Sequence, residues 1–206
     1  MRTWWRVLVQ MFQPRRKGAP PGVILTLLRL ETATPARAAM STKEKQKAQS
    51  DIRKTATDTL NKLYKVQPKA RQAIATSAGY AVFSNFGMKI LVAGSGSGKG
   101  LAVNSKTRVE TFMKMFEVQA GLGIGVKKFR VVFVFESESA LNAFINSGWE
   151  AGGEATAAAK AGDKGGDLAG ALSVSPGVWM YQLTDKGLAA ELAVKGTKYS
   201  KDSDLN

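Results

Sequence analysis

The sequence predicts an α+β domain in which an N-terminal amphipathic helix packs on antiparallel strands that form a barrel or a sandwich. Three observations lead to this prediction. A long stretch with helical spacing comes first, short strand-like runs punctuated by glycine follow, and a further helix near 138–147 interrupts them. Of the 206 residues, 44% are hydrophobic and 22% are charged, which is typical of a globular protein with one core.

The long helix is expected over residues 44–66. Its apolar residues recur at three- and four-residue spacing and form one stripe: Ala48, Ile52, Ala56, Leu60 and Leu63. Ser41 or Thr42 can cap its start, and Pro68 ends it. Its other faces are basic, so the helix either packs on a core with these faces in water or lies on an anionic membrane. The thin, alanine-rich stripe favours packing.

Shorter elements follow in a regular order. A second helix is expected from Pro68 to about Ser77, and β-like runs follow at 80–83, 88–92, 107–116 and 129–135. Ser137 can cap the helix over 138–147. The runs 178–183 and 188–194 flank a turn at 184–187, which indicates a hairpin. The alanine-rich stretch 150–172 is compatible with a helix or a strand, and closely spaced glycines favour the strand.

The composition restricts the chemistry. The chain has no His and no Cys, and 30 Lys+Arg against 16 Asp+Glu give a formal net charge of +14. Disulfides, thiolate nucleophiles, Cys/His zinc sites and Ser-His-Asp catalysis are therefore excluded. We expect no enzymatic activity, no cofactor, no metal site and no small-molecule substrate. The excess of positive charge indicates an anionic partner.

The charge is unevenly distributed along the chain. Residues 43–71 hold nine basic and three acidic residues, whereas 131–191 hold three basic and eight acidic residues. Residues 1–38 form a separate basic segment, in which 15–17 precede a short apolar run at 22–28 and 36–38 fit a small-residue cleavage site. This segment is expected to be a signal peptide or a disordered basic tail, ahead of a domain over 39–206.

Two glycine runs look like nucleotide-binding loops but depart from them. In the run 94–100, Ala93 and Gly100 occupy the places where a phosphate-binding loop has Gly and Ser or Thr, and a strand follows instead of a helix. In the run 121–125, the third glycine falls one place early. We expect a flexible hairpin loop with Lys99 at its tip in the first run and tight strand packing in the second.

Five motifs in order resemble the SYLF domain family, also called the Ysc-type actin-binding domain. They lie at 79–85, 94–100, 120–125, 137–150 and 187–197, and the resemblance extends over about 44–199. Ser84 and Lys195 depart from the family pattern, which has Pro and an acidic residue there. The resemblance implies a non-catalytic lipid-binding module of the bacterial, exported type. The expected location is the periplasm with peripheral membrane association, or the cytoplasm if residues 1–38 are not a signal.

Charge and resemblance together predict binding of anionic phospholipid, with phosphoinositide-like headgroups, at a membrane surface. The alternative is a structural or protein-interaction module of the bacterial envelope whose basic face meets an acidic protein or polymer. Nucleic acid is not an expected partner, because export and the lack of a base-stacking aromatic array argue against it. The candidate lipid-binding residues are Lys45, Arg53, Lys54, Lys62, Lys65, Lys99, Lys127, Lys128 and Arg130. Charge reversal at Arg53 and Lys54 is expected to abolish liposome binding without lowering the melting temperature.

Overall fold

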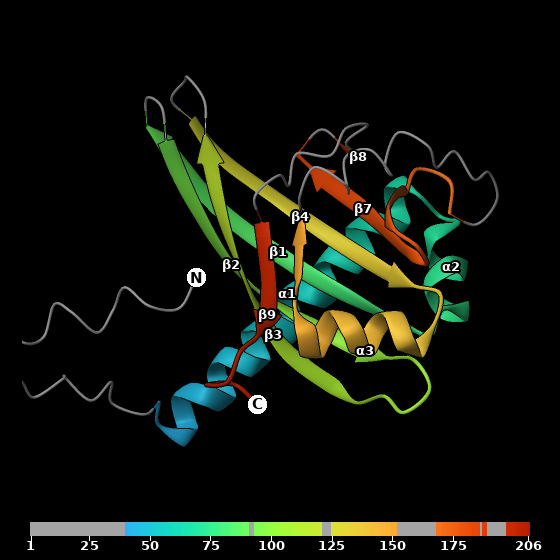
Figure 1. Ribbon diagram of the computed structural model, residues 1–206, viewed down its shortest axis with the longest axis horizontal. Coiled ribbons are helices and arrows are strands. Elements are labelled where there is room, and N and C mark those ends of the chain that lie inside the picture. The colour runs from blue at the N-terminus through green and yellow to red at the C-terminus, as the bar shows by residue number, and fades with distance from the viewer. Residues whose placement is uncertain (1–39, 91–92, 121–124, 152–167, 186, 189–196) are drawn as a thin grey trace, which may run out of the picture. The chain divides into compact units, whose positions relative to one another are not determined.

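The structure is a computed structural model that describes residues 40–90, 93–120, 125–151, 168–185, 187–188 and 197–206. These residues form three helices and one nine-stranded antiparallel sheet (Figure 1), which confirms the predicted α+β class. Residues 39–206 form a compact unit of their own. The helices are α1 (Thr42–Val66), α2 (Ala70–Thr76) and α3 (Glu138–Ser147). The strands are β1 (Gly79–Ile90), β2 (Ala93–Asn104), β3 (Glu110–Ala120), β4 (Gly125–Phe135), β5 (Trp149–Ala151), β6 (Leu172–Ser175), β7 (Val178–Thr184), β8 (Gly187–Leu188) and β9 (Thr197–Lys201).

The strand order in the sheet is β5-β9-β3-β2-β1-β4-β7-β6, with β8 paired to β7. β1, β2 and β3 follow one another as neighbours, and β4 then crosses over to pair with the free edge of β1. The predicted hairpin is present in part, because β7 pairs with β8 at Leu183 and Thr184, whereas residues 189–194 of its second run lie outside the described residues. β9 lies on the opposite side of the sheet from β7 and β8, where it pairs with β3 and β5.

Both faces of the sheet are covered by helices. In Figure 1, α3 lies in front of the sheet, and α1 lies behind it. Alternate residues of a strand point to opposite faces, so Phe83 belongs to the core beneath α3, whereas Val82 belongs to the core beneath α1. In the α3 core, the ring of Tyr199 meets those of Phe83 and Phe133 edge-on, with centroids 4.7 and 5.1 Å apart. Each such pair contributes about 0.5–1.5 kcal/mol beyond the buried area.

The first helix forms where the spacing predicts it. Ser41 is its N-cap, and its hydroxyl accepts a hydrogen bond from the Glu44 backbone N–H. The Glu44 carboxylate in turn accepts bonds from the Ser41 hydroxyl and backbone N–H, and these bonds lower the pKa of Glu44. Ile52, Ala56 and Leu63 of the predicted stripe are buried against the sheet. No helix of the described part has the length and apolar character needed to cross a membrane.

The glycine run 94–100 is a strand, and the predicted flexible loop is wrong. It forms part of β2, and Lys99 lies in mid-strand and not at a tip. The glycines have a steric reason: a Cβ at Gly100 would lie 2.2 Å from Cδ1 of Phe83, and one at Gly98 would lie 2.3 Å from the Ser84 carbonyl oxygen and 2.9 Å from Cγ of Met115. Glycine makes room here for the backbone of β1 and for large side chains of the neighbouring strands.

Several other predictions can be compared with the structure. The run at 80–83 and residues 88–90 of the next run belong to one strand, β1, and residues 91–92 lie outside the described residues. The helix over 138–147 is confirmed as α3, with Ser137 as its N-cap and Gly148 at a φ of 72° just after it. The segment 1–38, most of the run 121–125 and residues 152–167 of the ambiguous stretch lie outside the described residues.

Gly100→Ala is expected to lower the free energy of unfolding by about 1–3 kcal/mol, because the added methyl group must displace the Phe83 ring. Denaturant unfolding monitored by circular dichroism measures this change. Ser97→Ala is the matched control, since Ser97 is exposed on the same strand and its substitution is expected to change stability by less than about 0.5 kcal/mol. Equal stability of the two variants would show that this glycine is not needed for packing.

Candidate functional site

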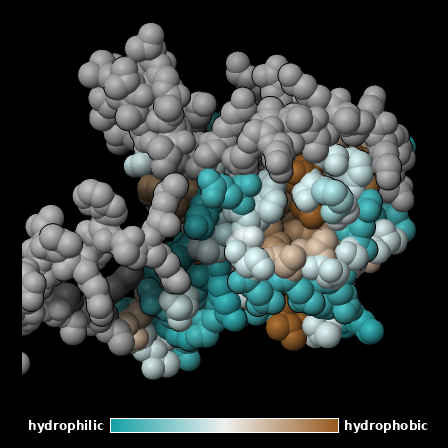
Figure 2. Space-filling model, in the orientation of Figure 1, coloured by the Kyte–Doolittle hydropathy of each residue, from teal (hydrophilic) through white to brown (hydrophobic). Residues whose placement is uncertain are grey.

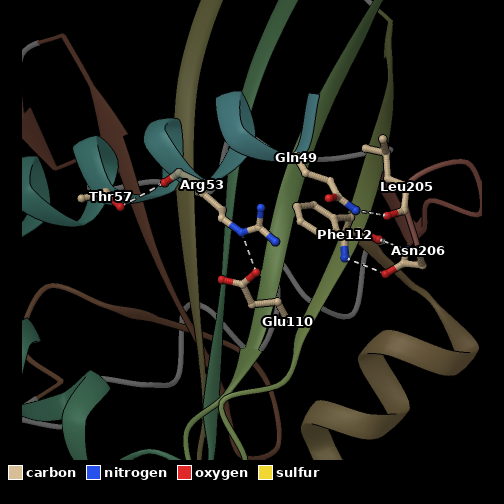
Figure 3. Close-up of polar contacts among 7 residues, drawn as sticks. All are labelled: Gln49, Arg53, Thr57, Glu110, Phe112, Leu205 and Asn206. Atoms are coloured by element: carbon tan, nitrogen blue, oxygen red, sulfur yellow. Dashed lines mark hydrogen bonds and ion pairs between the residues drawn. The ribbon is translucent and has the colours of Figure 1, made fainter. Parts of the chain in front are cut away.

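Arg53 joins α1 to β3 and is not a free cation on the helix surface (Figure 3). Its Nε lies 2.7 Å from Oε2 of Glu110, and its guanidinium carbon lies 5.0 Å from the centre of the Phe112 ring. Each of these contacts contributes about 1 kcal/mol or less at a partly exposed site. Reversing the charge of Arg53 would place two carboxylates together. The contacts therefore contradict the expectation that this substitution leaves the melting temperature unchanged.

Residues at the end of the sequence fasten the first half of α1 to the sheet (Figure 3). Nε2 of Gln49 donates to the Leu205 carbonyl at 2.8 Å, and Nζ of Lys45 donates to the Asn206 carbonyl at 2.8 Å. The side-chain amide of Asn206 donates to the Phe112 carbonyl and accepts from the Phe112 N–H, so it bonds β3 as a strand residue would. Leu205 is fully buried in the core beneath α1.

The remaining predicted cations of α1 differ in their surroundings. Nζ of Lys54 lies 3.1 Å from Oδ2 of Asp58, one turn along the helix, and this exposed pair is weak. Lys62 and Lys65 form no ion pair with any residue that the structure describes. The helix therefore offers its unpaired predicted cations only near its C-terminal end.

A second group of cations lies on the sheet, on the face that α1 covers. Lys99 of β2 is directly opposite Lys114 of β3 on one side and Ser84 of β1 on the other, and Ser84 is opposite Arg130 of β4. Phe112, two residues before Lys114 on the same face, belongs to the core beneath α1. Lys99, Lys114 and Arg130 thus form a line across four adjacent strands at the border of that core, which we name the basic row.

The basic row has few counter-charges. Like charges directly opposite each other on paired strands destabilise the sheet, and Lys99 and Lys114 are such a pair. Oδ2 of the buried Asp202 lies 4.0 Å from Nζ of Lys99. Lys114 and Arg130 form no ion pair within the described part of the chain, and Nε of Arg130 is buried there without a hydrogen-bond partner. An anion placed on the row would offset this repulsion.

The structure combines predicted and unpredicted residues in the row. It brings Lys99 and Arg130 together and adds Lys114, which sequence reasoning missed. Lys127 and Lys128 lie in β4, but their side chains are outside the described part of the structure. Nothing near Lys114 in the sequence marks it, because only the pairing of β2 with β3 places it beside Lys99. Only the strand register identifies Lys114 as part of the row.

A cavity of about 400 Å³ opens beside α3, on the opposite face of the sheet. Ser137, Ser139 and other serines line it together with the Phe144 and Trp149 rings, and no charged residue lines it. Figure 2 shows a neutral to weakly hydrophobic surface over α3. Within the described ranges, no group of three or more carboxylates is close enough to hold a metal ion. The cavity therefore has no charge with which to bind an anion.

Comparison with known proteins gives two matches. Residues 116–206 match the model of the family described as "Ysc84: Las17-binding protein actin regulator". The chain is 33% identical over 166 residues to beta cell expansion factor A of Aeromonas veronii, and the match covers 81% of this chain and 62% of that protein. The chain thus spans less than two thirds of that relative's length. The motifs at 120–125, 137–150 and 187–197 fall within the family match.

Arg53→Ala is expected to lower the free energy of unfolding by about 1 kcal/mol, because it removes both the ion pair with Glu110 and the contact with Phe112. Lys54→Ala is the control, with an expected loss below about 0.5 kcal/mol. A double-mutant cycle with Glu110→Ala isolates the pair from other effects. If the effects of the two single substitutions simply add, Arg53 and Glu110 are not coupled.

Proposed function

This chain belongs to the SYLF (Ysc84) family, whose model matches residues 116–206, and from that premise we propose that it is a non-catalytic module that binds anionic phospholipid at a membrane surface. The family is one of binding domains, so a lipid- or protein-binding module is the general function. The observation that carries the lipid proposal is the basic row: three cations in one line across β3, β2, β1 and β4, of which only Lys99 has an ion-pair partner, Asp202, among the described residues.

The chemistry of the row suits phosphate groups. Lys presents a compact ammonium group and Arg a planar fork of donors, and both bind phosphate oxygens. Ser84 and Ser200 lie in the same cross-strand line as Lys114 and supply hydroxyl donors beside the cations. Each Lys or Arg near an anionic membrane surface contributes about 1 kcal/mol of binding free energy. A line of three cations therefore suffices for weak, salt-sensitive membrane binding.

Location is part of the proposal. Residues 1–38 would act as the export signal and bring the domain to the periplasm, where phospholipid and acidic envelope polymers are available. A phosphoinositide-like headgroup is one form of the anionic ligand, and any phospholipid with net negative charge supplies the same phosphate chemistry.

A protein partner is the second candidate function. The family that matches residues 116–206 is described as a Las17-binding actin regulator, so some member of it binds a protein. An acidic protein of the envelope would meet the basic row by the same charge attraction as a phospholipid. The two candidates can be distinguished by experiment, because only a lipid-binding module is expected to bind vesicles that contain no protein.

Flotation with vesicles tests the lipid proposal. Residues 39–206 and the full chain are each mixed with vesicles of phosphatidylcholine alone or of phosphatidylcholine and phosphatidylglycerol in equal parts. We expect residues 39–206 to float only with the anionic vesicles. Flotation should weaken as salt shortens the Debye length from about 10 Å at 0.1 M to about 3 Å at 1 M. If residues 39–206 fail to float at low salt, lipid binding by the domain is excluded and the protein partner becomes the leading candidate.

A further inference from the structure

Resting on the proposed lipid binding, we infer that the domain contacts the membrane through the end of the sheet that extends past α1, and not through α1 itself. This sheet end consists of the strand segments 84–90, 93–99, 114–120 and 125–130 of β1 to β4, on the face that carries the basic row. Its partner is a bilayer surface that contains anionic phospholipid.

The four strands end at the same level. β1 pairs with β2 as far as Ile90 opposite Ala93, and β2 pairs with β3 as far as Ala93 opposite Ala120. β4 pairs with β1 from Phe135 to Gly125, which lies opposite Lys89. Figure 1 shows these strand ends at the upper left, running past the helices. The sheet end is therefore a paired, four-stranded extension of the domain.

One step beyond the basic row, on the same face, Phe116 of β3 lies opposite Ser97 of β2 and Lys198 of β9. Strand alternation places every second residue on this face, so Phe116 follows Lys114. The side chain of Phe116 is 54% exposed, which is costly for an aromatic ring in water.

The spacing of charge and apolar surface matches a bilayer interface. Phe116 lies two residues, or about 7 Å, along the strand from Lys114. The headgroup layer of each leaflet is roughly 5–7 Å thick. Cations at the level of the phosphates would thus place the Phe116 ring at the boundary of the acyl chains, which is how interfacial proteins combine charge and hydrophobic burial.

The first helix is a poorer candidate for this contact. Its apolar face is buried in the domain core at Ile52, Ala56 and Leu63, and inserting this face would break the contacts that hold α1 to the sheet. Near its C-terminal end, α1 offers Val66, which is 45% exposed, beside Lys65. Those residues provide a matched comparison with the sheet end.

Two double variants of residues 39–206 with equal loss of charge separate the two surfaces. K99Q/K114Q is expected to weaken partition onto phosphatidylcholine–phosphatidylglycerol vesicles about thirtyfold, from two lysines at about 1 kcal/mol each. K62Q/K65Q is expected to weaken it less than about threefold, because α1 lies farther from the membrane. Circular dichroism and the unfolding midpoint show that both variants are folded. If K62Q/K65Q has the larger effect or the two are equal, the inference is wrong, although lipid binding by the domain stands.

A fluorescence comparison tests the contact without removing charge. Phe116→Trp and Val66→Trp each place an indole at an exposed position, on the sheet end and on α1 respectively. With anionic vesicles, we expect the emission of the Phe116→Trp variant to move to shorter wavelength, as the ring leaves water, and that of the Val66→Trp variant to stay unchanged. A shift only at residue 66, or at neither residue, overturns the inference. Failure of the unsubstituted domain to bind vesicles would instead overturn the proposed function.

Discussion

The structure depends on the burial of both faces of the four central strands. Because successive residues of a strand point to opposite sides, each strand must supply two sets of apolar side chains, one beneath α1 and one beneath α3. Val82 and Phe83 show this division at adjacent positions. Where the helices stop, the same alternation continues without a cover. The basic row and the exposed ring of Phe116 are the result.

The attachment of α1 has a consequence for its positive charge. Arg53 pairs with Glu110, and Lys45 and Gln49 bond to the segment that contains Leu205, so these polar groups of the helix hold the domain together. The exposed pair of Lys54 with Asp58 adds little to the stability of the domain. A basic helix is therefore not by itself an anion-binding surface, because some of its cations are neutralised by their structural partners.

The basic row differs from the paired cations of α1, because its charges destabilise the free protein. Lys99 and Lys114 are held side by side by the register of β2 and β3, and their repulsion costs stability in the free protein. A bound anion reduces this repulsion only in the folded state, so binding and folding stability are linked. Salt reduces both the repulsion and the attraction to the anion, since exposed charges are screened over about 10 Å at 0.1 M ionic strength.

The sequence by itself determined the elements whose stabilising contacts are local. The capping box of Ser41 with Glu44 fixes the start of α1, and Ser137 and Gly148 bound α3, because these contacts join residues within a few positions of each other. The family was also recognisable from motifs in order along the chain. Only the tertiary structure decided that the glycine run 94–100 is a strand, since Gly98 and Gly100 are explained by the close approach of β1 and by Phe83 and Met115 of neighbouring strands. The basic row arose in the same way. Strand pairing places Lys99, Lys114 and Arg130 in one line across the sheet, and pairing between distant segments leaves no local pattern in the sequence.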